Sequence, residues 1–476
     1  MNDHRVIEIV ELNDAAVGTD TAATTEEEQL HLTGIQLPAP PVNPDAASFH
    51  DKALTHCFDQ INGLLREAPR CFLVETSPHT IVRIPQPLRG INPKAEKPEI
   101  VSIGPYHRNQ PQVLAFEKLK PLFLERFLRR MGGRMEELRK IVAFQESSAR
   151  HCYSEQVDME IADFTQMMLL DCCFVLELLL LFFESGTAAD EVDLIFAQPQ
   201  IIPILLRDLL KLENQIPYFL LQSLFNSAVP STERKKTGSL GTLALKFFDQ
   251  AYPRPMAPLK SWGDCDCEHL LDLFYLSLKP TSGVYPHYTK EKWPSAQSVP
   301  CVTELRPSGI KFKSRSQADS FLDISFQKPL LRIPGVPIND FMTTVLINCV
   351  SLEHCRKNRS KYMTDYASFM HCLINQPKDV SLLRSDGIIA PFSHDDQYVA
   401  NLFDKLAKCI SFNVHDCFLS EQFEELQLYY HSNWATMRRT YFSSPWSFIS
   451  AFSAFLLIVL TIIQTVIGIL TYCSHR

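Results

Sequence analysis

The chain of 476 residues is longer than one hydrophobic core usually organises, so two lobes or one extended helical domain are expected. Its 46% apolar and 21% charged residues are ordinary for a folded protein, which excludes a wholly disordered chain. The net charge of −8 lies in the first 50 residues, which hold nine acids and one base, and the neutral remainder offers no basic field, so nucleic-acid binding is not expected.

The N-terminus and the cysteines bear on the cellular compartment. Glu8 and Glu11 interrupt the first apolar cluster, so no secretory signal is recognised. The fourteen cysteines fall mostly in helical patterns, where they act as small hydrophobic residues, and reduced thiols are expected. The opposite interpretation is a domain on the secretory side, for which the one glycosylation sequon at Asn358 would speak.

The first part of the chain is predicted to change from disorder to extended structure. Residues 1–50 form an acidic tail that ends in a proline run and is expected to be disordered. A helix is predicted at 48–65. Prolines then exclude long helices, and extended segments are expected at 80–85 and 99–103.

Helical spacing begins at 112–146, where Gly132-Gly133 is expected to separate two helices. The next helix, 161–183, is apolar nearly all round and is predicted to be a buried core helix, because Asp171 and Glu177 make a second membrane span costly. These carboxylates lie about 240° apart on a helix and cannot act on one substrate atom. Each is expected to pair with an arginine or a helix end.

The remaining elements follow from apolar spacing and alternation. Glu213, Asn214 and Gln215 follow an apolar helix, so they must be hydrogen-bonded inside the fold or exposed at a corner. Exposed loops are expected at 226–241 and 279–300. Further helices are predicted at 204–212, 218–225, 243–252, 268–278, 341–356, 362–375, 379–385, 395–409 and 420–441. A small antiparallel sheet is predicted from strands at 309–313, 321–326 and 330–334.

The last predicted helix, 446–470, contains no Asp, Glu, Lys, Arg or His. Roughly 20 helical residues cross a hydrocarbon core about 30 Å thick, so a single C-terminal transmembrane helix is predicted. Small residues lie on one stripe of it with Gln464 beside them, which suits self-association in lipid, although ordinary transmembrane composition explains the same pattern. The stripe consists of Ser450, Ala454, Thr461, Thr465 and Gly468.

Signatures of catalysis are absent from the sequence. Ser308 and Lys311 match S-x-x-K, and 236–238 matches K-T-G, but the two occur in the wrong order and are attributed to chance. Residues 264–269 offer three zinc ligands where structural zinc needs four, so a surface turn that caps the following helix is preferred. His107 is assigned to a turn-anchoring aromatic cluster. The sequence therefore predicts no catalytic, cofactor-binding or metal-binding residue.

Several long stretches, in a fixed order, resemble the plant family catalogued as domain of unknown function 247. They are IVRIPQPLR (81–89), IVSIGPYH (100–107), ARHCYSE (149–155), MMLLDCCFVLELL (167–179), DLLKLENQIPYFLL (208–221), FLDISF (321–326), DVSLLRSDGII (379–389) and YFSSPWSFISAFSAFLLIVLTIIQT (441–465). The chain departs from the family at Cys172, at Glu96 and at Lys328-Pro329, and the last departure bears on the hairpin turn. The resemblance implies a mainly helical plant protein with a C-terminal membrane anchor and no established enzymatic activity. Some grass members are proposed to act in self-incompatibility.

Together these features predict a mainly α fold with a small antiparallel β element and one C-terminal transmembrane helix. Three regions are expected: a disordered tail (1–50), a helical domain (51–440) and a membrane anchor (441–476). The expected function is non-enzymatic interaction with an unknown protein partner, such as recognition in self-incompatibility, at the plasma membrane or an endomembrane with the body in the cytosol. The alternatives are an enzyme whose site lies among Asp171, Glu177 and 213–215, and a purely structural tether.

Overall fold

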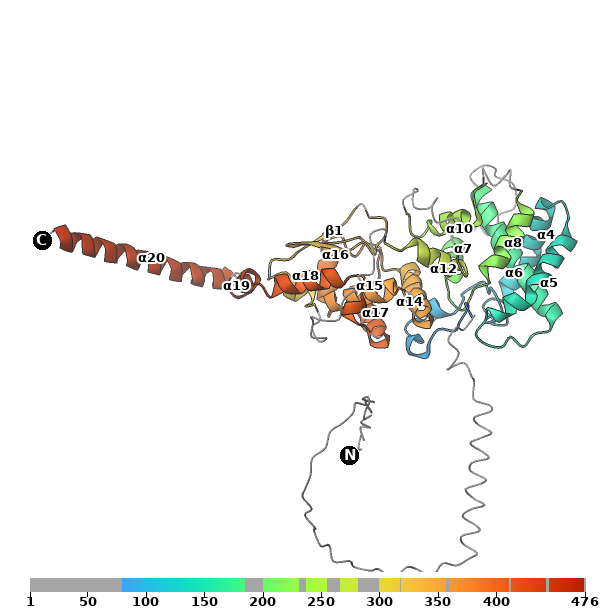
Figure 1. Ribbon diagram of the computed structural model, residues 1–476, viewed down its shortest axis with the longest axis horizontal. Coiled ribbons are helices and arrows are strands. Elements are labelled where there is room, and N and C mark those ends of the chain that lie inside the picture. Colours follow the sequence, from blue (N-terminus) through green and yellow to red (C-terminus); the bar gives the residue numbers. More distant parts are fainter. Residues whose placement is uncertain are drawn as a thin grey trace, which may run out of the picture. The chain divides into compact units, whose positions relative to one another are not determined.

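Helix α6 (Ile161–Glu184) is the centre of the first group of helices in the computed structural model (Figure 1). It packs against α4 (Lys120–Arg130), α5 (Met135–His151), α8 (Tyr218–Ala228) and α10 (Leu240–Phe248). Because neighbouring helices cover α6 on several sides, α6 can be apolar around its whole circumference and has no polar face toward water. The prediction of a buried core helix at 161–183 is confirmed, since 78% of its most apolar stretch is buried.

The structure describes residues 79–184, 200–230, 237–254, 266–280, 299–316, 318–356, 360–410, 412–441 and 445–474. The chain divides into two compact units, Met1–Ser77 and Pro78–Arg476, and every described residue belongs to the second. The predicted tail at 1–50 and the predicted helix at 48–65 lie outside the described residues, as do 231–236 and 281–298 of the two predicted loops.

A second group of helices follows the sheet in the chain, with α15 (Tyr362–Leu373) packed against α14 (Asp340–Cys355) and α17 (Asp396–Cys409). Capping side chains define the starts of α14 and α17, where Asn339 and Asp395 accept backbone N–H groups. The other helices of the folded body are α16 (Pro377–Ser385), α18 (Ser420–Tyr430), α7 (Ile201–Asp208), α12 (Leu270–Ser277), and the short turns η2 (Gln86–Leu88), α2 (Pro93–Glu96), α3 (Leu114–Glu117), α13 (Val302–Leu305) and η3 (Val414–Asp416). The mainly α fold is confirmed.

One predicted helix boundary is confirmed, and one helix predicted as continuous is interrupted. Gly132 and Gly133 adopt positive φ angles of 66° and 81° and separate α4 from α5, as predicted. The helix predicted at 420–441 is instead two helices, α18 and α19 (Asn433–Tyr441). The hydroxyl of Ser432 accepts a hydrogen bond from Ala435 N at 3.3 Å, so Ser432 begins a new helix there.

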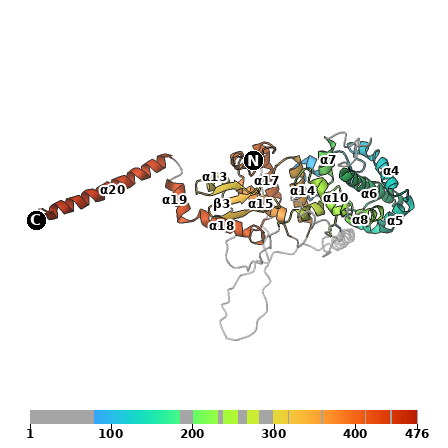
Figure 2. The same cartoon turned by 90° about the horizontal axis from the view of Figure 1, so that it is seen from above.

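The small sheet is mixed, where the sequence predicted an antiparallel one (Figure 2). Strands β2 (Ser325–Gln327) and β3 (Leu330–Ile333) pair antiparallel across the hairpin at Lys328-Pro329, so the departure from the family at these residues does not prevent the hairpin. Strand β1 (Lys311–Ser314) pairs with the other edge of β3 and runs parallel to it. Residues 315–329, which include β2, connect β1 to β3, and this is long enough for the two strands to pair in parallel. The strand predicted at 321–326 begins only at Ser325, because the carboxylate of Asp323 closes a turn over 319–323.

The C-terminal helix α20 (Pro445–Ser474) differs from α6 in its surroundings. Among the described residues these two helices are long and apolar enough to cross a membrane. The 22-residue stretch Phe452–Cys473 has a mean hydropathy of 2.5, and none of it is buried, whereas α6 is enclosed by protein. Of the two, α20 is the candidate membrane span.

Candidate functional site

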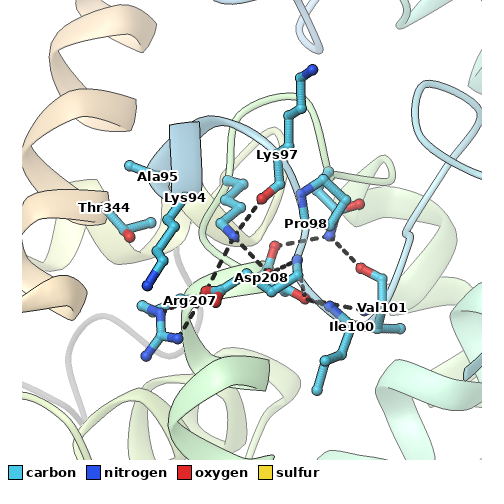
Figure 3. Close-up of polar contacts among 12 residues, drawn as sticks. Lys94, Ala95, Lys97, Pro98, Ile100, Val101, Arg207, Asp208 and Thr344 are labelled. Atoms are coloured by element: carbon cyan, nitrogen blue, oxygen red, sulfur yellow. Dashed lines mark hydrogen bonds and ion pairs between the residues drawn. The ribbon is translucent and has the colours of Figure 1, made fainter. Parts of the chain in front are cut away.

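Asp208, the last residue of α7, binds the backbone of residues 99–101, where the chain bends. Its buried carboxylate accepts hydrogen bonds from Glu99 N at 2.9 Å, Ile100 N at 2.9 Å and Val101 N at 3.0 Å (Figure 3). Three consecutive N–H groups converge on this one carboxylate, which requires a bent backbone, and the chain bends at 99–100. The extended structure predicted at 99–103 is thus not formed as a strand, and the Asp208 side chain fixes the bend in its place.

The charge of Asp208 is matched by Lys211, one helical turn further on. The ammonium of Lys211 lies 2.7 Å from Asp208 Oδ1 and donates to the carbonyl of Lys97 at 2.7 Å (Figure 3). Burial lowers the pKa of Lys211, and the adjacent Asp208 carboxylate opposes that effect. Arg207 adds an ion pair with Glu99 at 2.8 Å. The charged groups of this cluster therefore bind one another and the backbone of the adjacent residues.

Asn214 and Gln215 close the end of α7 with their side-chain amides. Asn214 donates to the carbonyls of Asp208 and Val101 and accepts from Ile103 N at 2.7 Å. Gln215 donates to the carbonyls of Leu209 and Lys211 and accepts from Leu271 N at 3.1 Å. These amides satisfy helix-end carbonyls, which is why α7 ends at Asp208 and not at the predicted residue 212. Hydrogen bonding inside the fold was one of the two arrangements predicted for this polar triplet.

Asp171 binds the same stretch of chain at its other end, Gly104. Its carboxylate accepts from Gly104 N at 2.8 Å and pairs with the buried ammonium of Lys120 at 2.5 Å. Lys120 also donates to the carbonyl of Ser102 at 2.6 Å. Gly104 has a φ of 78°, and a Cβ there would lie 2.7 Å from the carbonyl oxygen of Gln215. Only glycine fits this backbone approach.

Glu213 is also buried, but it is the least buried member of the polar group. It accepts from Arg83 at 2.9 Å and from Ile84 N at 2.9 Å, and its Oε2 lies 3.2 Å from Nε2 of the buried His107. Burial would raise the pKa of Glu213, but His107 and Arg83 lower that pKa to about 2. The guanidinium carbon of Arg83 lies 3.9 Å from the ring centroid of Tyr106. Tyr106 belongs to the aromatic turn predicted around His107.

Glu177 belongs to a separate ion-pair group on α6. Arg130 lies 3.0 Å and Arg126 3.4 Å from its carboxylate. Burial raises the pKa of Glu177, and these two arginines oppose the rise. Glu177 and Asp171 thus have separate ionic partners, and the pairing predicted for Glu177 with an arginine is present. The partner of Asp171, however, is a lysine and not an arginine or a helix end.

Of the remaining motif residues, 236, 264 and 265 lie outside the described residues, and the others take part in the local structure. His269 is buried, and its Nδ1 accepts from Asp272 N at 3.1 Å, so it caps α12 as predicted, from the core and not from a surface turn. Across the part of the chain that the structure describes, no three His, Cys, Asp or Glu side chains are grouped as metal ligands. Ser308 is buried in the turn before β1, and Lys311 is an exposed strand residue.

A cavity of about 790 Å³ lies elsewhere in the body, between α7 and the start of α14. Phe182, Arg207, Phe341, Phe392 and His394 contribute to its lining. None of the five polar residues singled out in the sequence lines it. These five residues are therefore separate from the cavity, whereas Arg207, which pairs with Glu99 beside Asp208, lines it.

These contacts define an α-helical protein whose buried charges fasten residues 99–104 into the core and whose C-terminal helix is a candidate membrane span. The chain belongs to the plant family DUF247, described as plant protein of unknown function, whose model matches residues 81–460. It is similar to UPF0481 protein At3g47200 of Arabidopsis thaliana, with 32% identity over 83% of this chain and 87% of that protein. A second relative, Putative UPF0481 protein At3g02645 of the same plant, is 21% identical over 81% of this chain and 89% of its own length. No solved structure matches.

Proposed function

We propose that the chain is a membrane-anchored, non-enzymatic protein that acts through protein–protein interaction. The observation that carries this proposal is α20, which has no charged residue over Pro445–Ser474 and whose apolar stretch Phe452–Cys473 is not buried in the described chain. Leaving such a surface in water is costly, and a bilayer removes that cost. The helical body would then be held at the membrane with its N-terminal side in the cytosol.

Protease protection on intact membrane vesicles tests the anchor and its orientation. With a tag at each end of the full chain, external protease is expected to remove the N-terminal tag and the body from cytosol-facing vesicles and to leave the α20 fragment membrane-bound. Extraction of the whole chain by alkaline carbonate would contradict the anchor. A protected body would place it on the other side of the membrane and favour extracellular recognition, the setting implied by the family's proposed role in self-incompatibility.

The buried polar groups support a non-enzymatic body over the rival enzyme. The side chains of Asp171, Asn214 and Gln215 are hydrogen-bonded to backbone groups, and Asp171 is also paired with Lys120. Ion pairs with arginines bind Glu177 and Glu213. A general acid or base needs a free direction toward a substrate. Proximity labelling around the full chain distinguishes a third reading, because a purely structural tether predicts no specific partner.

Self-association through the stripe of α20 is the partner proposal that can be tested most directly. Thr461 and Thr465 donate their hydroxyls to helix carbonyls at 2.8 and 2.7 Å, which leaves small surfaces on that side. An added Cβ at Gly468 meets no atom, so leucine fits the single helix and disturbs only a helix pair. Gly468→Leu with Gln464→Leu is expected to convert a dimer to a monomer in detergent cross-linking. Ile467→Leu is the control, and unchanged size in the double variant would remove this proposal.

A further inference from the structure

The polar face of the small sheet is cationic. In the register of β1, β3 and β2, Phe312, Leu331 and Phe326 form the row on the buried face. The opposite face carries Lys311 and Lys313 of β1 and Arg332 of β3, and the exposed Lys328 stands in the hairpin beside it. The three strands contain no acidic residue.

These four cations have no counter-charge within the described chain. None of them forms a salt bridge with a described residue, and only Arg332 has a side-chain hydrogen bond, to Gln327 Oε1 at 2.6 Å. The carboxylate of the nearby Asp386 forms an ion pair with Arg306 and not with these four cations. The glutamates of α18 belong to a helix that packs on the buried face, where Tyr429 contacts Phe326. An uncompensated cationic surface attracts an anionic partner.

Helix α19 fastens this sheet to the chain that enters the membrane. Arg439 reaches Ser308 Oγ at 3.3 Å, and Arg438 lies against Gly309, where an added Cβ would meet Nη1 at 2.7 Å. Both contacts are in the turn just before β1. Figure 2 places α18, β3 and the start of α19 at the same end of the body. The cationic face is thus close in space to the end of α19.

The outer side of α19 is apolar and aromatic. Trp434, Met437 and Tyr441 are 59%, 37% and 52% exposed and recur at the spacing of one helix face. Ala435 is buried on the opposite side. Tryptophan and tyrosine beside cationic residues are the composition of a helix that lies at a membrane–water boundary. No other described part of the body combines such a helix with an adjoining cationic sheet.

The chain length keeps these groups near the bilayer. Only three residues separate Tyr441 from Pro445, the first residue of α20, so at most about 14 Å can separate these two residues. We propose that the end of the body formed by α19 and the sheet docks on anionic phospholipid headgroups of the membrane that α20 enters. Trp434, Met437 and Tyr441 would sit at the boundary with the acyl chains, and Lys311, Lys313, Lys328 and Arg332 would contact the headgroups. This inference rests on the membrane anchoring proposed above.

The test measures lysine accessibility in the full chain reconstituted into vesicles. A membrane-impermeant acetylating reagent is applied to protein in phosphatidylcholine vesicles and in vesicles that also contain phosphatidylserine. One cation near an anionic surface strengthens binding about fivefold, so Lys311 and Lys313 are expected to react at least roughly fivefold more slowly when phosphatidylserine is present. The exposed Lys118 and Lys140 of the same molecule serve as internal references with unchanged rates. High salt should abolish the difference, because it screens the headgroup charge.

Charge reversal separates docking from insertion. In Lys313→Glu with Arg332→Glu, the rate at Lys311 is expected to become independent of phosphatidylserine, whereas Lys118→Glu with Lys140→Glu should behave as wild type. Thermal unfolding of each variant shows that the body is folded. If wild type floats with the vesicles but Lys311 reacts equally in both lipids, the docking inference is overturned and the anchor stands. If wild type fails to float with either vesicle, the anchoring proposal fails first.

Discussion

Replacing Asp208 with alanine is expected to lower the free energy of unfolding by roughly 3–5 kcal/mol, because it leaves the buried charge of Lys211 without its partner. The same change removes the acceptors of Glu99 N, Ile100 N and Val101 N, which lie in a segment without a strand neighbour. Urea unfolding of the detergent-solubilised full chain, followed by circular dichroism, measures the difference.

The origin of that loss can be separated by a double-mutant cycle. If the unpaired ammonium dominates, adding Lys211→Met to Asp208→Ala is expected to restore at least about 1 kcal/mol. Additive losses from the two changes would contradict this explanation. Asp404→Ala is the matched control, because Asp404 pairs with Lys408 at 2.7 Å on the exposed side of α17, where an ion pair contributes less than about 1 kcal/mol.

Much of the helical order was predictable, because the signals for it are local. Apolar spacing marked α4, α5 and α14–α17, and glycines or capping residues marked several of their ends. The error at 420–441 arose where both halves have helical composition. Ser432, a capping residue after His431, was the signal that could have revealed the break. The mixed sheet was not predictable from alternation, because alternation does not state which edge of β3 a strand joins.

The polar core was only half predictable, for a reason of distance along the chain. Buried carboxylates predict that hydrogen-bonding partners exist, but they do not predict which residues these are, because the partners are distant in sequence. Val101, for example, lies 107 residues from Asp208. Asp208 and Lys120 were missed altogether. For Asp208 the available signal was the pair Asp208 and Lys211 at i, i+3 in an otherwise apolar stretch. Lys120 stands in a helix with many charges, and nothing local distinguishes it from its exposed neighbours.

The charge of Glu213 is expected to make stability depend on acidity in a defined window. Its pKa is lowered from 4.5 to about 2 by His107 and Arg83, against the effect of burial. Above pH 4.5 the ionised carboxylate stabilises the fold by about 3 kcal/mol. Between pH 4.5 and about 2 the unfolded chain binds the proton before the folded chain does, so this contribution is lost as the pH falls.

Glu213→Gln isolates that contribution from the other acids of the chain. The unfolding free energy of wild type is expected to exceed that of the variant by about 3 kcal/mol at pH 5 and above, and the gap should close toward pH 2. Burial lowers the pKa of His269 from 6.5 to about 4, so both proteins should lose stability together as the pH falls from 6.5 toward 4. The gap should therefore stay level from pH 7 to 5. Urea unfolding at each pH measures it, and a gap that stays constant down to pH 2 would mean that Glu213 does not hold Arg83 and His107 through its charge.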